Sequence, residues 1–278
     1  MKKLFIFAIV ALGMLACSDK NAPSNLSYKE GALNGKFSVN DSTQVQFSRG
    51  NLQYNANKNI WQFAENQCDY IGEDNCKSQN IYDLFDWGTG DNPILEHYQD
   101  YDIFIDWGNN IISNGGNTTN VWRTLTMDEW IYLLHGRVTA ENLFGFGTLN
   151  EIKGLIILPD NWETSNGSSF VASTNMGLTW IYDFYSNSNE NNFTHNTYTT
   201  AAWEKMENEG AVFLPAAGWK GEKGVYYENM EGFYWSSSSH GEGLAYNIFF
   251  SKKILSANGS SRNSGCSARL VHYVSAVE

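Results

Sequence analysis

Two short segments of this chain place a carboxylate next to a tryptophan and a glycine, a combination that could hold calcium. The segments are 85–90 (FDWGTG) and 105–109 (IDWGN), in a region rich in Asp, Asn and Gly. Asp86 and Asp106, with nearby carbonyl groups, would supply the oxygen ligands that calcium prefers. In the structural alternative, the tryptophan packs in the core and the aspartate accepts backbone N–H groups at a turn. We favour this alternative because Asx turns are common and the EF-hand loop pattern is absent, so no metal or other cofactor is expected.

The four cysteines of the chain are the next candidates for chemistry. Cys68 and Cys76 are close together in a polar segment (CDYIGEDNC). Either a local disulfide or a free pair fits this sequence, because geometry decides between them. Cys266 lies near the C-terminus, with no second cysteine beside it and no evident base. The histidines are scattered and show no zinc-ligand spacing.

Sequence patterns that support catalysis are absent from the chain. It has no nucleophile elbow, phosphate-binding loop, zinc-binding helix motif or kinase signature. A carboxylate pair for glycoside cleavage can always be chosen from 30 acidic residues, but the separation of the two groups decides that chemistry. We therefore expect a protein that is not an enzyme.

Charge and composition narrow the classes of partner. The net charge of −12 and the isoelectric point near 4.8 argue against binding of nucleic acid or anionic lipid through general electrostatic attraction. The aromatic content of 15% is high enough for a sizeable core and too high for a disordered chain. With 278 residues, the chain is long enough for one large domain or two small ones.

The N-terminal residues have the pattern of a targeting segment. Two lysines precede an apolar run that is too short to span a bilayer, and the run ends in Leu15-Ala16-Cys17. This ending resembles the lipobox of bacterial lipoproteins, which implies that 1–16 is a signal peptide and that Cys17 carries lipid. An ordinary secretion signal is the alternative. We expect 17–35 to be a flexible tether and 36–278 to be a single domain.

Hydrophobic periodicity predicts two helices among short strands. The clearer helix is 122–137, in which Thr126 and Glu129 form a capping box. A second helix is expected at 201–206. The segments expected to form strands are 44–54 and 59–64, which read as a hairpin, and 154–159 and 211–216, which read as buried strands. The expected class is α+β, with short antiparallel strands, two helices and long irregular loops.

The stretch 232–271 organises the rest of the chain. Strands are expected at 233–235, 244–250 and 268–274, and the links between them are rich in Ser, Gly, Asn and His. In the middle strand, alternate residues should face opposite sides of the sheet. A rigid sheet that presents adaptable polar side chains is typical of a binding surface.

Four motifs in this chain, taken in order, resemble a known family. They are 122–126 (WRTLT) followed by Glu129-Trp130, 211–218 (AVFLPAAG), 232–238 (GFYWSSS), and Gly265 followed by 267–271 (SARLV). The chain resembles exported lipoproteins of Bacteroidetes related to the Fibrobacter succinogenes major paralogous domain. That resemblance covers most of 36–274 and implies the C-type-lectin-like fold that formylglycine-generating enzymes share. It also implies an outer membrane lipoprotein, at the cell surface or facing the periplasm.

The resemblance further implies an adhesin-like module, with its ligand, a glycan or a protein, bound on the late strands and their loops. No nucleic acid is expected, and the only membrane contact expected is the N-terminal lipid. The alternatives are a structural subunit of a surface assembly such as a pilus tip, or a formylglycine-generating-type thiol oxidase that uses Cys266. We expect the ligand-binding side chains to share one exposed face. They are Ser239, His240, Glu242, Tyr246, Asn247, Phe249, Lys253, Asn258, Ser260, Ser261 and Asn263.

Overall fold

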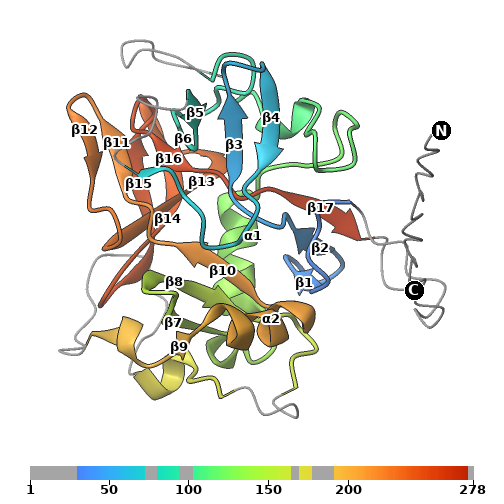
Figure 1. Ribbon diagram of the computed structural model, residues 1–278, viewed down its shortest axis with the longest axis vertical. Helices are drawn as coiled ribbons and strands as arrows, with labels where there is room; N and C mark the ends of the chain where they lie inside the picture. The colour runs from blue at the N-terminus through green and yellow to red at the C-terminus, as the bar shows by residue number, and fades with distance from the viewer. Residues whose placement is uncertain (1–29, 73–79, 94–102, 164–168, 177–190, 275–278) are drawn as a thin grey trace, which may run out of the picture.

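The described part of the chain consists mostly of strands, with two α-helices, and so belongs to the expected α+β class (Figure 1). The structure is a computed structural model that describes residues 30–72, 80–93, 103–163, 169–176 and 191–274. The predicted signal peptide 1–16, the predicted lipidation site Cys17 and Cys76, for which the sequence leaves both a disulfide and a free thiol open, lie outside these residues.

Two small antiparallel sheets contain the first strands of the described chain, and one of them also contains its last strand. In the first, β2 lies between β1 and β17, so the last strand pairs with one of the earliest. The second is the predicted N-terminal hairpin, β3 with β4, extended by β5. The bounds of these strands are β1 Phe37–Ser38, β2 Gln44–Phe47, β3 Leu52–Asn55, β4 Ile60–Phe63, β5 Ile81–Tyr82 and β17 Val271–Val274.

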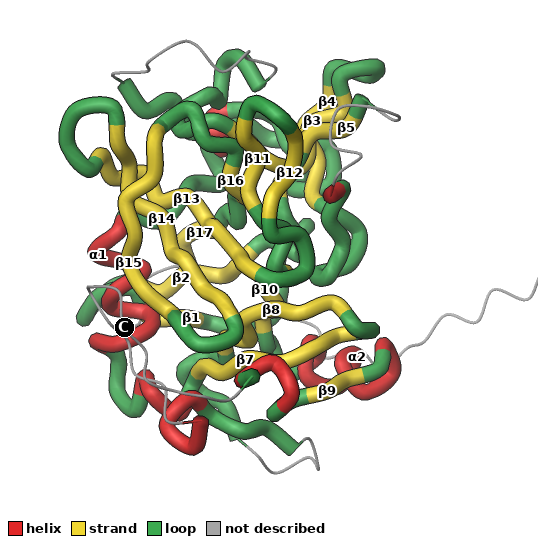
Figure 2. The backbone as a smooth tube through the Cα atoms, turned by 90° about the vertical axis from the view of Figure 1, so that its left-hand side faces the viewer, coloured by secondary structure: helices red, strands yellow, loops and turns green. Residues whose placement is uncertain are grey.

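The other strands form a four-stranded sheet, a hairpin and a five-stranded sheet within the described residues. The four-stranded sheet contains the predicted buried strands, in the order β10 (Val212–Pro215), β8 (Ile152–Ile157), β7 (Phe144–Leu149) and β9 (Thr197–Tyr198). The hairpin joins β11 (Trp219–Gly221) to β12 (Gly224–Tyr226). The five-stranded sheet has the order β15 (Leu255–Ser261), β14 (Leu244–Ser251), β13 (Glu231–Ser239), β16 (Cys266–Ser267) and β6 (Leu84–Phe85). Figure 2 shows the first four of these strands.

Both predicted helices are present, and the caps set where they begin. Thr126 and Glu129 form the capping box, so α1 (Met127–Ile131) begins after Thr126 and not at residue 122. A π-helical turn, Tyr132–Gly136, continues α1. Thr199 caps α2 (Thr200–Asn208) through its hydroxyl group. The shorter 3₁₀ segments are Trp107–Asn109, Ala140–Asn142, Ser173–Met176 and Asn192–Thr194.

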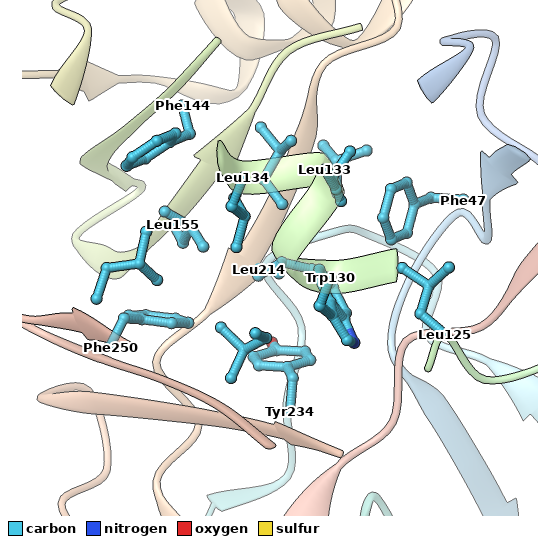
Figure 3. Packing of buried hydrophobic residues seen from close by; sticks show 14 of the residues in the cluster. Phe47, Leu125, Trp130, Leu133, Leu134, Phe144, Leu155, Leu214, Tyr234 and Phe250 are labelled. Carbon is cyan, nitrogen blue, oxygen red and sulfur yellow. The ribbon is translucent and has the colours of Figure 1, made fainter. Parts of the chain in front are cut away.

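The main hydrophobic core lies around α1, between the four-stranded and five-stranded sheets. Trp130, Leu133 and Leu134 all project from the helical segment into this core, as the periodicity predicts (Figure 3). Tyr234 and Phe250 approach from the five-stranded sheet, with their rings stacked at 6.1 Å. The helix is therefore fixed by apolar contacts on its inner face, since a helix this short is unstable alone.

A second cluster, rich in tryptophan, lies against the other face of the five-stranded sheet. Trp87 and Trp107, the tryptophans of the two Asp-Trp-Gly segments, belong to it together with Trp235. The two segments lie side by side, because Gly90 donates its N–H to Ile105 O. The five-stranded sheet is thus covered over much of both faces, and only part of it is left for ligand.

Two expectations about the fold need correction. Residues 255–261, expected to be part of a polar link, form β15, because small apolar and polar residues alternate there and pair with β14. The packed chain begins before residue 36, since Leu33 is buried and donates its N–H to Phe47 O.

Candidate functional site

A groove lies between α1 and the outer half of strands β13, β14 and β15. Its volume is about 720 Å³, within the range of roughly 300–1,000 Å³ that is usual for small-ligand sites. Met127, Ile131 and Leu244 supply apolar walls, and His240 and Tyr246 supply aromatic rings. We call this hollow the α1–β15 groove; its other lining residues are Asp128, Ser238, Ala257, Asn258 and Gly259.

Hydrogen bonds to β13 fix α1 at one side of the groove. Ser237 donates its N–H to Leu125 O at 2.9 Å, just before the helix. Met127, the first helical residue, donates its N–H to the Ser238 hydroxyl at 3.0 Å. The pairing of β13 with β14 shifts register between Trp235 and Ser239. This irregularity frees backbone groups of β13 for the contacts with the helix.

Arg262 holds the turn at the other side of the groove. Its guanidinium donates to Leu244 O at 3.2 Å, to the Ser239 hydroxyl at 2.8 Å and to Gly241 O at 3.0 Å. Arg262 is only 6% exposed, and its guanidinium lies 4.8 Å from the centre of the Trp87 ring. One buried cation therefore ties the β13–β14 turn to the tryptophan cluster.

The contact of His240 with Tyr246 in the groove requires a glycine at position 259. The rings of His240 and Tyr246 are 4.1 Å apart between centroids. A Cβ atom at Gly259 would lie 2.4 Å from His240 Cδ2, which is closer than such atoms approach. Gly259 therefore provides the space in which the His240 ring lies against Tyr246.

The charge near the groove is negative. Asp128 lies in its lining, and Glu242 is in the turn between His240 and Leu244. Both side chains are exposed, and neither has an ion-pair partner among the described residues. A cation at the groove would therefore be attracted by these two carboxylates and by the net charge of the whole chain.

The predicted ligand-binding residues do not share one exposed face, and that expectation is wrong. Tyr246 lines the groove, but its neighbour Asn247 is fully buried on the opposite face, because successive side chains of a strand alternate. Phe249 is also buried there and packs against Phe233, with 4.9 Å between the ring centroids. Lys253 lies in the β14–β15 turn, at the far end of β14 from His240.

The remaining predicted residues fall into three groups. Ser239, His240 and Glu242 are exposed at the β13–β14 turn, beside the groove. Asn258 and Ser260 direct their side chains to the Asn247 side of β15, since Asn247 and Asn258 both donate their side-chain amides to the Ser260 hydroxyl. Asn258 also borders the groove. Ser261 and Asn263 are exposed at the end of β15 and just after it.

Several residues of the groove were not predicted. Met127, Asp128 and Ile131 belong to α1, and only the fold shows that this helix reaches the late strands. Arg262 lies among the predicted residues, but nothing in a single arginine indicates that it is buried. Gly259 would indicate a close approach only inside a strand, and its segment, 255–261, is expected from the sequence to be a link.

The cysteines do not form a thiol site in the described part of the chain. Cys266 is fully buried, and burial raises the pKa of its thiol well above the usual value. A protonated, enclosed thiol is a poor nucleophile, so its position does not fit the thiol-oxidase alternative. Cys68 is half-buried and is a free cysteine, and Cys76 lies outside the described residues.

The carboxylate of Asp106 has the structural role that the sequence favours. Its oxygens accept hydrogen bonds from Gly108 N at 3.0 Å, Thr124 N at 2.9 Å and the Thr124 hydroxyl at 3.0 Å. These contacts hold the second Asp-Trp-Gly segment beside the start of α1. Among the described residues, no group of three His, Cys, Asp or Glu side chains is arranged to hold a metal ion.

Two other hollows are less suited to a ligand. One, of about 620 Å³, is lined by Asp160, whose carboxylate is already bound by Ser38, Gln44 and Arg137. The second, of about 900 Å³, is lined in part by Ile71 and Ile81, and the segment 73–79 between them in the sequence is outside the described part of the chain.

A buried acid lies close to the second hollow. Asp83 is 1% exposed and accepts the Ile71 N–H at 2.7 Å through one carboxylate oxygen. Its other oxygen has no hydrogen-bond partner within the described residues. Burial, with a smaller contribution from the nearby Glu228 carboxylate, raises the pKa of Asp83 to about 7.

Comparison with known proteins identifies no relative. No family model matches the chain, and searches of curated proteins and of solved structures give no significant match. In the described residues, no helix is both long enough and apolar enough to cross a membrane. The functional argument therefore depends on the geometry of the groove.

The raised pKa of Asp83 predicts how stability depends on pH. Its folded-state pKa, about 7, exceeds the ordinary value of 3.8, so the folded protein binds this proton more tightly than the unfolded chain. The free energy of unfolding should fall by up to about 1.4 kcal/mol per pH unit as the pH rises between these two pKa values. Asp83→Asn keeps the acceptor for Ile71 and should remove that dependence.

Urea unfolding of both proteins between about pH 4 and pH 8 tests this prediction. Asp83→Asn should gain stability relative to the wild type as pH rises. A difference between the two proteins that stays constant over the whole range would contradict the assignment of the buried proton to Asp83.

Proposed function

We propose that this protein is a ligand-binding module that takes its ligand in the α1–β15 groove. One observation carries the proposal: an aromatic pair, His240 and Tyr246, lies in a concave site whose two sides are independently fixed. Aromatic side chains at the centre of a held site supply contact area at low entropic cost. A binding function also agrees with the buried, protonated state of Cys266.

The C-type-lectin-like fold and the lipoprotein family remain part of this proposal. Two features of the structure support them. The last strand, β17, pairs with the N-terminal strand β2, which closes the domain. Arg269, in the SARLV motif, is fully buried and donates to Gln67 at 3.0 Å, so a motif residue contributes to the interior. Neither feature identifies a ligand, and the ligand is argued from the groove.

Binding is proposed to occur at the outer membrane, with the protein anchored through lipid on Cys17. The supporting observation is the apolar run that ends in Leu15-Ala16-Cys17. In cells fed with radioactive palmitate, the wild type should be labelled and recovered with membranes. Cys17→Ser should lose the label and enter the soluble fraction. Equal labelling of the two proteins would refute the anchor, since stable anchoring requires the acyl chains.

The groove is tested by comparing two matched double variants on a glycan array and a protein array. Asp128→Asn with His240→Ala should weaken binding at least about tenfold, because groups at the centre of a site contribute most of the affinity. Lys253→Ala with Asn263→Ala should retain affinity within about twofold, because both residues lie outside the groove lining.

The control is circular dichroism with thermal unfolding, which should show that all the variants remain folded. The proposal fails if the wild type binds nothing on either array. It also fails if the groove variant keeps the full binding profile while the Lys253 and Asn263 variant loses it.

A further inference from the structure

The groove opens beside an unpaired sheet edge. In the described part of the chain, β15 is the last strand of its sheet, with β14 as its single neighbour. Figure 2 shows β15 along the outer side of the sheet, next to α1. Unpaired edges can accept a further strand from another chain. Ala257 and Gly259, which line the groove, belong to this edge strand.

The hydrogen-bond register shows which backbone groups point outward. Arg262 donates its N–H to Gly243 O, and Ser251 donates its N–H to Ile254 O. Hydrogen-bonded pairs alternate along an antiparallel ladder, so Asn258 and Ser260 direct their backbone groups toward β14. Ala257, Gly259 and Ser261 therefore direct theirs away from it.

These outward backbone N–H and C=O groups can form hydrogen bonds with the backbone of another chain. Ser261 O accepts the N–H of Ser264, but no hydrogen bond within the described residues uses the outward N–H groups of Ala257, Gly259 or Ser261. Gly259 and Ser261 are exposed, whereas Ala257 is only 8% exposed and Leu255, at the other end of β15, is fully buried. The available edge is thus the segment 259–261, which lies beside the groove.

A strand added at this edge would also reach the groove with its side chains. It would lie about 4.8 Å beyond β15, and every second side chain would be on the α1 side of the sheet. There these side chains would contact the apolar residues Ile131 and Leu244, the Tyr246 ring and the Asp128 carboxylate. A lysine or arginine fits these groups best, through a cation–π contact and charge attraction.

We propose that the ligand of the α1–β15 groove is an extended, basic segment of a partner protein, added to β15 as a further strand. The inference rests on the proposed function and specifies its ligand. The outward backbone groups of Gly259 and Ser261 bind the segment, and the groove selects alternating basic and apolar side chains. The carboxylates of Asp128 and Glu242 favour this segment over an acidic one.

A phage-displayed random peptide library, panned on the protein, tests this inference. The selected peptides should alternate apolar and basic residues. They are then synthesised with N-methyl groups at single positions, and their affinities are measured by fluorescence anisotropy. N-methylation at every other position should weaken binding about tenfold or more, because it removes a backbone hydrogen bond and adds bulk at the edge. N-methylation at the intervening positions should have little effect.

Two protein variants provide the matched comparison. Asp128→Asn should weaken the basic peptides by about threefold to tenfold and reduce their salt dependence. Glu222→Gln removes an exposed carboxylate of the β11–β12 hairpin and should leave affinity unchanged. Gly259→Ala, which displaces His240, should weaken binding as well.

Several outcomes would overturn the inference. They are a library that yields no binder, peptides that are acidic or lack alternation, and N-methylation that has the same effect at every position. Self-association of the protein through β15, detected by sedimentation, would also overturn it. If a glycan binds in a groove-dependent manner and peptides do not, the proposed function stands and this inference alone fails. If neither binds, both fail.

Discussion

The buried guanidinium of Arg262 is the interaction on which the groove depends. It binds two carbonyl groups and one hydroxyl of the β13–β14 turn and stacks on Trp87. The turn contains Gly241 and Gly243 and would otherwise be mobile, because glycine loses the most conformational freedom on ordering. The guanidinium holds this turn in one conformation, so that the turn forms one side of the groove and His240 stays against Tyr246. The tryptophan cluster beneath it is therefore as much a part of the site as the groove lining.

The alternation of side chains along β14 imposes a second constraint. Only one of two successive residues can face α1, so Tyr246 reaches the groove while Asn247 becomes part of the interior. The opposite face contains buried polar groups, and Asn247 donates its side-chain amide to Ser260. A polar residue in a late strand is therefore not by itself a surface residue, and the groove is smaller and more apolar than the sequence suggests.

Local signals predicted most of the elements. The capping box at Thr126 and Glu129, the buried runs in β8 and β10, and the helix after Thr199 are all present, because each pattern is read within a few residues. The features that could not be predicted depend on contacts between residues far apart in the sequence. The burial of Arg262 depends on Trp87, and the groove depends on α1 meeting β13 and β14. β15 was missed because its side chains are small, so that its hydrophobic alternation is weak.

Amide hydrogen–deuterium exchange measures most directly whether Arg262 holds the groove in place. The wild type is compared with Arg262→Gln, and Arg49→Gln, which removes a surface guanidinium bound to Glu65 O, provides the control. Exchange should accelerate in residues 239–244 of Arg262→Gln while the amides of β8 and β10 keep their protection. Unchanged exchange in that turn, or acceleration spread evenly over the chain, would contradict the account.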